Sequence, residues 1–569
     1  MSDTKPARPR TRKPRAAAQD AAPPQVEPAP PPTPEAGVAP DDAAPPPATR
    51  RALVSVYRKD GLAELGRALV QRGFEVVSTG GSAAALREAG VAVTPVQDVT
   101  GFPEILDGRV KTLHPRVHAG LLARRDAPSH VAALGEHGIA PIDVLVVNLY
   151  PFEDKVAKGA AFDEAVEHID VGGPAMLRAA AKNFRSVSVV VDPSDYALLL
   201  EQLDREGGPD AATRLYFAQK AFRHSARYEA AIAAWFAQVE VRGDGYAPAE
   251  ADDTFPYRLA VQFEKVQDLR YGENPHQRAA FYSDLGSTLY SVAAAHKLQG
   301  KELSFNNILD LDAAWRLATE IEEPACVIVK HSNPCGVGLG ANLLEAWERA
   351  WECDPTSAFG GILAFNRKVD VETARRVADV FVEAVIAPGF ERPARELLAA
   401  KKNLRLMDMD TTGLHKVSGF DLRRVVGGLL AQQWDLHRLE RAKCDVVTRR
   451  KPSEDEWRAL LLAWTVCKHV KSNAIVFASA AQTVGVGAGQ MSRVDAARFA
   501  ALKARLPLHG TCAASDAFFP FRDGLDEIAR AGATAVIQPG GSVRDDEVVA
   551  AAEEHGLAMV FTGVRHFRH

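Results

Sequence analysis

The chain has 569 residues, 47% of them hydrophobic and 25% charged, with a formal net charge of -5 at pH 7. This length exceeds that of one ordinary domain, the composition is typical of folded proteins, and the negative charge argues against nucleic acid as the main ligand. No apolar run approaches the about 20 residues of a membrane-spanning helix. The six cysteines have no paired spacing, which favours a reduced, cytoplasmic protein.

Residues 1–50 differ from the rest of the chain. They hold fourteen of the 35 prolines, many alanines and almost no large apolar side chain. Such a segment cannot bury enough surface to offset the entropy lost on ordering, so the composition predicts a disordered tail. The arginines near its start are not followed by the apolar stretch of a secretory signal.

Strand-like and helix-like runs alternate between residues 51 and 191. The apolar, β-branched runs are "RALVSVY" (51–57), "FEVVST" (74–79), "DVLVVNLY" (143–150) and "SVSVVV" (186–191), and the helical runs are "GLAELGRALVQRG" (61–73) and "SAAALREAG" (82–90). This alternation predicts βαβ units in a mostly parallel, doubly wound α/β sheet. Ligands of such sheets bind beyond the carboxyl ends of the strands.

A helical stretch over residues 195–238 leads to a polar segment around 242–256. We place a domain boundary in that segment, between a first domain of residues 51–250 and a second of residues 257–569.

The second domain contains a weak internal duplication. "KHSN" (330–333), "SAFGG" (357–361) and "AVIAPG" (384–389) are followed in the same order by "VKSN" (470–473), "SDAFF" (515–519) and "AVIQPG" (535–540). Three matches in order predict two related α/β subdomains.

A glycine turn in the first domain is a candidate anion site. In "STGGSAAALREAG" (78–90), Gly80 and Gly81 let the backbone approach a ligand, and Ser82 is predicted to cap the helix. The free amides and the positive end of the helix dipole attract anions. An ordinary, well-capped turn is the alternative interpretation.

A basic stretch follows in "GRVKTLHPRVHAG" (108–120). Arg109 and Lys111 are predicted to lie on one side of an extended segment, beside Thr112, as a grip on phosphate. A zinc site at His114 and His118 is disfavoured, because the glutamate of an HExxH motif is missing.

Further polar groups follow predicted strand ends. Asn148 and Tyr150 close the strand of residues 143–150, Asp170 stands where "DVGGPAMLRAAAK" (170–182) opens a helix, and Lys182 lies about three turns along that helix. Together with the glycine turn and the basic stretch, they predict a small-molecule site for a phosphorylated substrate.

In the second domain, "ACVIVKHSNPCGVGLG" (325–340) ends an apolar run with Lys330 and His331. Its glycines at alternate positions predict a flexible loop, and "GVGAGQMSR" (485–493) is similarly predicted to be a mobile glycine stretch. The aromatic and basic carboxyl terminus, "FTGVRHFRH", is predicted to be docked, with Arg565 as a candidate ligand contact.

Many uncommon motifs resemble one family in order, from about residue 51 to residue 569. They are "GRVKTLHPRVHAG", "DVGGPAMLRAAAKN", "LRYGENPHQ", "KHSNPCG", "SAFGG", "SNAIV", "GAGQMSR", "SDAFFPFRDG" and "RHFRH". The chain is similar to the bifunctional purine biosynthesis family, which joins an IMP cyclohydrolase to an aminoimidazole carboxamide ribonucleotide (AICAR) formyltransferase. The resemblance implies a methylglyoxal-synthase-like first domain and a second domain of two cytidine-deaminase-like α/β subdomains.

The resemblance also implies the reactions. The second domain would transfer a formyl group from the co-substrate 10-formyltetrahydrofolate to AICAR, and the first would close formyl-AICAR to IMP with loss of water. A homodimer is implied, with neither nucleic acid nor membrane as a partner. Zinc deaminases need a Pro-Cys-x-x-Cys arrangement, but Pro334 and Cys335 are followed by Gly338, so metal-free transfer is favoured.

Site residues carried over from the family motifs fall into four sets. His331 would be the general base and Lys330 its cationic helper, while Lys182 would donate and accept the proton of cyclisation, with Tyr150 and Asp170 nearby. The cyclohydrolase nucleotide contacts would be Tyr57, Arg58, Lys59, Thr79, Gly80, Gly81, Ser82, Arg109, Val110, Lys111, Thr112, Val147, Asn148, Asp170 and Val171. The AICAR contacts would be Arg270, Tyr271, Gly360, Glu383, Asn473, Arg493, Phe518 and Arg565, and the folate contacts Val494, Asp523, Ser542 and Val543.

One departure from the family pattern stands at residues 55–59, where "SVYRK" replaces the usual "SVSDK": Lys59 keeps its place, but Tyr57 and Arg58 differ. Two other functions remain alternatives. One is a nucleotide-sensing module without reacting groups, against which Lys182, Lys330, His331 and Asp523 argue. The other is methylglyoxal synthesis, which leaves the second domain unexplained.

Overall fold

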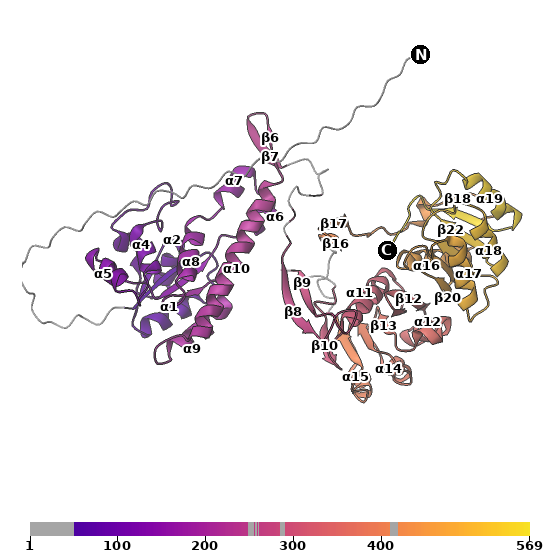
Figure 1. The fold of residues 1–569 in the computed structure, drawn as a ribbon, viewed down its shortest axis with the longest axis horizontal. Helices are drawn as coiled ribbons and strands as arrows, with labels where there is room; N and C mark the ends of the chain where they lie inside the picture. Colours follow the sequence, from indigo (N-terminus) through magenta and orange to yellow (C-terminus); the bar gives the residue numbers. More distant parts are fainter. Residues whose placement is uncertain (1–49, 249–254, 256–258, 260, 285–290, 410–418) are drawn as a thin grey trace, which may run out of the picture. The chain divides into compact units, whose positions relative to one another are not determined.

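The structure, a computed structural model, describes residues 50–248, 255, 259, 261–284, 291–409 and 419–569. The chain divides into two compact units, Met1–Ala260 and Val261–His569 (Figure 1). The predicted tail, apart from its last residue, lies outside the described residues, as does part of the predicted linker.

The first unit is built on a five-stranded, wholly parallel sheet of order β3-β2-β1-β4-β5. The predicted doubly wound sheet is therefore confirmed. Its central strands are apolar at nearly every position because both faces are covered. The strands are β1 (Arg50–Val56), β2 (Phe74–Ser78), β3 (Thr94–Pro95), β4 (Val144–Asn148) and β5 (Ser188–Val190).

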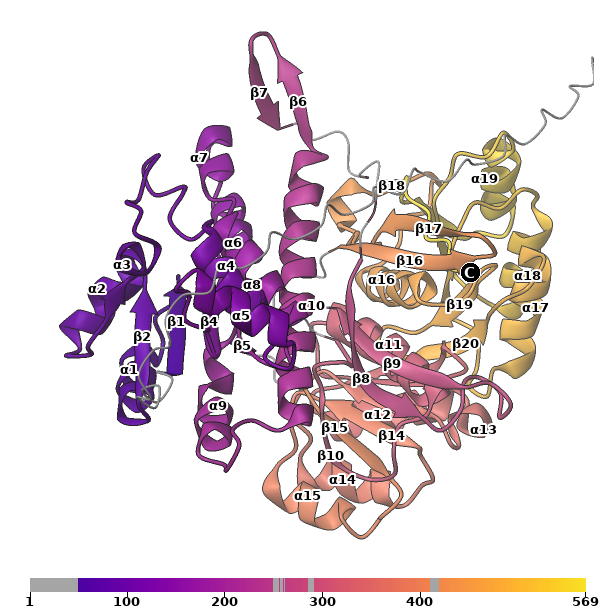
Figure 2. The same ribbon diagram turned by 60° about the vertical axis from the view of Figure 1, so that its left-hand side comes forward.

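The helices of this unit include a 26-residue helix, α10, from whose end a hairpin projects (Figure 2). The helices are α1 (Leu62–Gln71), α2 (Gly80–Glu88), α3 (Val96–Thr100), α4 (Pro115–Leu122), α5 (Pro128–Glu136), α6 (Phe152–Ala157), α7 (Phe162–Glu167), α8 (Gly172–Lys182), α9 (Tyr196–Leu203), preceded by the 3-10 turn Pro193–Asp195, and α10 (Ala211–Phe236). The hairpin pairs β6 (Val239–Arg242) with β7 (Gly245–Pro248).

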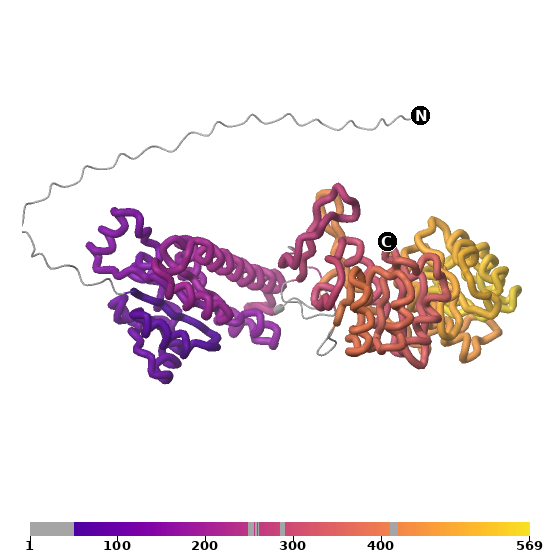
Figure 3. The backbone as a smooth tube through the Cα atoms, turned by 90° about the horizontal axis from the view of Figure 1, so that it is seen from below, coloured from indigo at the N-terminus to yellow at the C-terminus, as the bar shows by residue number. Residues whose placement is uncertain are grey.

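The second unit contains two six-stranded mixed sheets with the same topology, β10-β15-β14-β13-β11-β12 and β18-β23-β22-β21-β19-β20. In each sheet, three parallel strands lie between an antiparallel hairpin (β11–β12 or β19–β20) on one side and an antiparallel edge strand on the other. The two sheets occupy adjacent lobes (Figure 3), and Thr483 Oγ1 joins their edges by accepting a 2.9 Å hydrogen bond from the backbone N–H of Val337. The predicted duplication is confirmed.

The first lobe consists of β10 (His296–Gln299), α11 (Phe305–Glu320), β11 (Ala325–Lys330), β12 (Asn333–Leu339), α12 (Leu343–Cys353), α13 (Pro355–Ala358), β13 (Ile362–Phe365), α14 (Val371–Ala378), β14 (Ala384–Ala387), α15 (Arg392–Leu398) and β15 (Arg405–Asp408). Two separate hairpins, β8 (Phe263–Leu269) with β9 (Ala279–Asp284) and β16 (Phe420–Val425) with β17 (Gly428–Gln433), stand before and after this lobe in sequence.

The second lobe consists of the 3-10 turn Arg441–Lys443, β18 (Asp445–Val446), α16 (Glu454–Lys468), β19 (Ile475–Ala478), β20 (Thr483–Gly487), α17 (Arg493–Lys503), β21 (Cys512–Ser515), α18 (Asp523–Ala531), β22 (Ala535–Gln538), α19 (Asp545–Glu554) and β23 (Ala558–Phe561). In the described part of the chain, no helix combines the length and the apolar character that crossing a membrane requires.

Only one of the three sequence matches that suggested the duplication joins equivalent positions. "AVIAPG" and "AVIQPG" begin with the equivalent strands β14 and β22. By contrast, "KHSN" begins at the last residue of β11 whereas "VKSN" precedes β19, and "SAFGG" precedes β13 whereas "SDAFF" begins at the last residue of β21. The turn of the second hairpin therefore carries no counterpart of Lys330 and His331.

Most of the alternating glycines do not lie in loops, so the prediction of flexible loops was wrong for them. Gly336 and Gly338 lie in β12 and Gly485 and Gly487 in β20, where a helix approaches the strand closely, whereas Gly340 and Gly489 follow these strands. A Cβ at Gly338 would lie 2.2 Å from Ala346 O of α12, and one at Gly487 would lie 1.9 Å from Ala496 O of α17. Only glycine permits this approach.

Candidate active sites

A cavity of about 620 Å³ opens at the carboxyl ends of β1, β2 and β4, where a parallel sheet is expected to bind its ligand. The predicted residues that line it are Tyr57, Lys59, Thr79, Gly80, Gly81, Ser82, Arg109, Lys111, Thr112, Asn148, Tyr150, Asp170 and Val171. Arg58, Val110 and Val147 are not among the lining residues. The structure thus brings together most of the residues predicted for the cyclohydrolase site.

Two ammonium groups flank the glycine turn at the start of α2. A Cβ at Gly80 would lie 3.8 Å from Lys111 Nζ, and one at Gly81 would lie 3.6 Å from Lys59 Nζ. The backbone of Gly80 has a φ of 42°, which glycine adopts readily. Free amides at a helix start between two cations suit a phosphate group.

Two local predictions for this region were wrong. Ser82 does not cap α2: its hydroxyl donates to Val56 O and accepts from Val56 N, both at 2.9 Å, and so fastens the helix to β1. The segment with Arg109 and Lys111 is a tight turn closed by a bridge between Ile105 and Val110, not an extended run. Both cations nevertheless reach the cavity.

The side chain of Asn148 holds the loop that departs from the family pattern. Its Oδ1 accepts hydrogen bonds from the backbone of Tyr57 (2.6 Å) and Arg58 (3.0 Å), and its Nδ2 donates to Arg58 O. The loop backbone is therefore fixed whatever side chains it carries. The substituted Tyr57 packs edge-on against Tyr150, with ring centroids 5.6 Å apart.

Asp170 is the carboxylate of the cavity. Burial raises its pKa, while a 2.8 Å hydrogen bond from Gly173 N and the charge of Lys111 oppose that rise. A carboxyl with a raised pKa keeps its proton to a higher pH than an ordinary aspartate. It is thus suited to general acid–base work.

Lys182 does not line this cavity. It ends α8, ten residues from the first residue of that helix, which corresponds to about 15 Å of helix. It lines instead a separate cavity of about 1100 Å³ between α4, α8 and α10. Within one chain the structure therefore separates Lys182 from Asp170 and Tyr150.

His331 occupies the turn of the β11–β12 hairpin. His331 and Ser332 form a two-residue turn, and their φ angles of 55° and 59° lie in the left-handed region. Residues other than glycine, asparagine and aspartate rarely adopt this backbone conformation. Where it occurs, it is typically maintained at functional sites.

Asp310 of α11 holds that turn. Its carboxylate accepts hydrogen bonds from the backbone N–H groups of His331 (3.2 Å) and Ser332 (2.6 Å). The role of Asp310 was not predicted from the sequence, because nothing local to α11 shows that this carboxylate contacts a turn 21 and 22 residues further along the chain.

If the His331 turn carries out the formyl transfer that the family resemblance implies, Asp310→Ala should lower its turnover about tenfold to a hundredfold, because small displacements of a reacting group are costly. Cyclisation of added formyl-AICAR should not change. Separate assays of the two reactions check this, with Asp268→Ala in the exposed β8 hairpin as the control. Normal transferase turnover in Asp310→Ala would show that the turn holds its shape without the carboxylate.

Lys330 lies beside His331 with its ammonium fixed by a 2.7 Å hydrogen bond to Phe359 O. Both residues line a cavity of about 270 Å³ between the two lobes. Lys503 of α17 reaches across this cavity to Asp354 (2.9 Å) and Ser357 (3.2 Å). A base and a fixed cation therefore share one cavity.

The predicted AICAR contacts form three groups. Arg493 donates to Asn473 Oδ1 at 2.7 Å, and its guanidinium and that of Arg565 both lie over the ring of Phe567. The second group is Gly360 with Glu383, whose backbone N–H donates to the neighbouring Gly361 O at 3.0 Å. The third is Arg270 with Tyr271, whose hydroxyl accepts a 3.1 Å hydrogen bond from the Arg270 guanidinium. Among the described residues, no hydrogen bond or ion pair joins one group to another.

The hairpin turn connects two of these groups indirectly. Lys330 binds the residue before Gly360, and Asn333 Oδ1 accepts a 2.9 Å hydrogen bond from Lys471 N, two residues before Asn473. Phe518 and the predicted folate contacts lie near the carboxyl ends of β21 and β22: Val494 on α17, Asp523 at the start of α18, and Ser542 and Val543 before α19.

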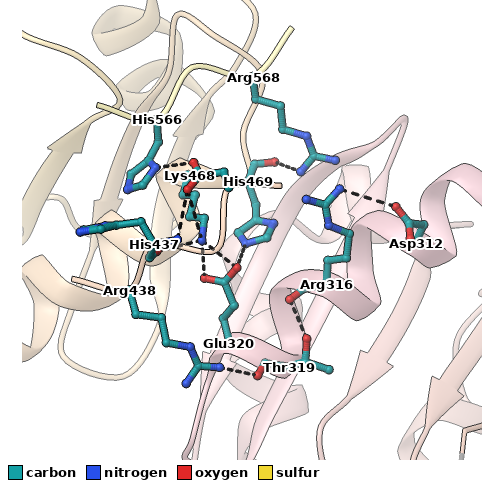
Figure 4. A network of polar contacts seen from close by, with 11 residues as sticks. Asp312, Arg316, Thr319, Glu320, His437, Arg438, Lys468, His469, His566 and Arg568 are labelled. Atoms are coloured by element: carbon teal, nitrogen blue, oxygen red, sulfur yellow. Dashed lines mark hydrogen bonds and ion pairs between the residues drawn. The ribbon is translucent and has the colours of Figure 1, made fainter. Parts of the chain in front are cut away.

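A buried ionic network anchors the carboxyl terminus and was also missed (Figure 4). Lys468, whose side chain is 6% exposed, donates to both carboxylate oxygens of Glu320 at 3.0 and 3.1 Å. Burial opposes the charge of Glu320, but hydrogen bonds from His469 and Lys468 outweigh it and hold its pKa below the ordinary value. His566 binds Asp435, and Arg568 binds His469 O, so the terminal segment is docked as predicted.

Comparison with known proteins agrees with this arrangement. Residues 61–175 match the model of the MGS-like domain, and residues 180–503 match that of the AICARFT/IMPCHase bienzyme. A solved structure titled "Crystal structure of ForH" is 38% identical over 33% of this chain and 98% of its own, but its TM-score of 0.30 is too low to support an argument about fold. Because the second match spans more than half of the sequence, the chain belongs to the AICARFT/IMPCHase bienzyme family, a bifunctional enzyme with AICAR formyltransferase and IMP cyclohydrolase activities.

Proposed function

We propose that the two activities reside in separate units of the chain. The first unit, through the 620 Å³ cavity, closes formyl-AICAR to IMP, and the second, through the His331 hairpin, transfers the formyl group. The observation that carries this assignment is the cavity at the strand ends, where two lysines flank a glycine turn and a buried carboxylate faces them. We also propose that the first domain ends near residue 250 and that the second begins near residue 257.

Formyl transfer needs a base and an oxyanion partner. The 5-amino nitrogen of AICAR attacks the formyl carbon of 10-formyltetrahydrofolate, the donor that the family uses. His331 accepts the proton of that amine, Lys330 stabilises the oxyanion, and N10 of tetrahydrofolate leaves with a proton. The contacts to AICAR and folate are those predicted from the motifs.

Cyclisation is a unimolecular step, so its rate depends on holding two groups of one molecule together. The phosphate is held at the glycine turn by Lys59 and Lys111. The carboxamide nitrogen attacks the formyl carbon, and the resulting hydroxyl leaves as water after receiving a proton. Asp170 and Tyr150 are placed to move these protons.

We propose that neither reaction uses a metal ion. A cysteine at position 338 would give the chain the Pro-Cys-x-x-Cys arrangement of zinc deaminases, but a Cβ there would lie 2.2 Å from Ala346 O. In the ranges that the structure describes, no group of three or more potential ligands was found. Chelators are expected to leave both rates unchanged. All six cysteines are free, which supports a cytoplasmic location.

We also propose a homodimer in which Lys182 of one copy completes the cyclohydrolase site of the other. Its own cavity lies away from Asp170 and is bordered by Leu122, Leu215 and Phe222, which are 39–44% exposed. Exposed apolar residues around a cavity are typical of an interface.

Complementation tests this arrangement. Lys182→Ala and Asp170→Asn are each expected to abolish cyclisation. If the copies share sites, an equal mixture refolded together regains about a quarter of the wild-type rate, since half of the dimers are mixed and each has one intact site. A mixture as inactive as its parents, or a monomer with full activity, contradicts the shared site.

A further inference from the structure

Tyr228 on α10 belongs to a small core behind the 620 Å³ cavity. Its ring is buried with Leu149, Phe152 and Ala165, in a cluster separate from the main core of the sheet. The rings of Tyr228 and Phe152 pack edge-on, with centroids 6.4 Å apart. The ring is thus fixed by elements that follow β4 and precede α8.

The hydroxyl of Tyr228 points out of this core to the segment that carries Asp170. It accepts a 2.7 Å hydrogen bond from Asp170 N and donates a 3.2 Å hydrogen bond to His168 O. One hydroxyl therefore holds two backbone groups two residues apart. Burial raises its pKa to about 12, so the hydroxyl keeps its proton throughout the neutral range.

The segment held in this way has little regular structure of its own. Residues 168–171 connect the end of α7 to the start of α8. In the described part of the chain, Asp170 N has no hydrogen-bond partner besides Tyr228, and the Asp170 carboxylate is tied on its other side to Gly173 N at 2.8 Å. Loss of the hydroxyl would release one of these two attachments.

We propose that Tyr228 is a positioning residue for the cyclohydrolase reaction. Its hydroxyl binds the backbone N–H of Asp170 and so keeps the Asp170 carboxylate in the cavity wall. The proposal rests on the proposed role of the cavity. Tyr228 itself does not line the cavity, and so acts only through Asp170.

The test uses Tyr228→Phe in the full chain, with Tyr196→Phe as a matched control. Both tyrosines are 7% exposed, but the Tyr196 hydroxyl is buried without a hydrogen-bond partner among the described residues. We measure kcat and KM for added formyl-AICAR across pH. Tyr228→Phe should lower kcat about tenfold to a hundredfold, leave KM nearly unchanged, and move the acidic limb of the pH profile to lower pH as Asp170 becomes better hydrated.

The control should keep the wild-type kcat and pH profile. An unshifted profile with normal kcat in Tyr228→Phe, or equal losses in both variants, overturns the positioning role. Asp170→Asn separates this result from failure of the underlying proposal. If Asp170→Asn cyclises normally, the assignment of the cavity is wrong; if it is inactive while Tyr228→Phe is normal, only the role of Tyr228 is lost.

Discussion

Replacing His331 with alanine is expected to slow formyl transfer by about 10²–10⁴-fold, the usual contribution of a positioned general base. The 5-amino group of AICAR is a weak nucleophile and must lose a proton as the new bond forms. AICAR affinity should fall much less, because the imidazole acts on the moving proton. Steady-state assays with AICAR and 10-formyltetrahydrofolate, together with AICAR titration, measure the two effects.

The matched control is His296→Ala, which removes an exposed histidine from β10 of the same lobe. Cyclisation of added formyl-AICAR should survive both changes, and Lys330→Ala should also lower transferase turnover. Near-normal formyl transfer in His331→Ala would mean that the hairpin turn only connects β11 to β12 and has no catalytic role.

Replacing Glu320 with alanine is expected to destabilise the second unit by about 3–5 kcal/mol, the typical cost of leaving a buried charge without its partner. Lys468 is 6% exposed, and its second-nearest carboxylate among the described residues is that of Asp435, at 3.9 Å. Chemical denaturation of the full chain, followed by tryptophan fluorescence, measures the change through Trp464 on the same helix as Lys468.

Glu322→Ala is the control, because that carboxylate is 89% exposed and lies 4.0 Å from Arg438; its loss should cost about 0–1 kcal/mol. The folded-state pKa of Glu320 lies below its unfolded value. Its contribution is therefore present near neutral pH and disappears as the pH falls through the folded-state pKa. Equal, small losses in both variants would contradict the buried ion pair.

The sequence predicted the features that depend on local pattern. Apolar β-branched runs alternating with helical spacing predicted the parallel sheet, and polar residues after those runs predicted the cavity at the strand ends. Tyr57, Lys59 and Asn148 converge there because parallel strands end at one edge.

The features that sequence alone did not predict depend on distance between elements. The glycines of β12 suggested flexibility, since nothing local reveals that α12 approaches the strand so closely. Lys182 belongs to the same sequence motif as Asp170, but it lies at the far end of α8, about 15 Å along the helix from its first residue. The hydroxyl of Tyr228 reaches Asp170 across 58 residues, a contact that only packing of α10 creates.

The most direct test of two independent sites is one time course followed in three proteins. Wild type, His331→Ala and Asp170→Asn each receive AICAR with 10-formyltetrahydrofolate, and then formyl-AICAR alone, while formyl-AICAR and IMP are quantified. We expect Asp170→Asn to accumulate formyl-AICAR without IMP, and His331→Ala to form little product from AICAR over the same time course yet convert added formyl-AICAR to IMP. Loss of both reactions in either folded variant would contradict the separation of the sites.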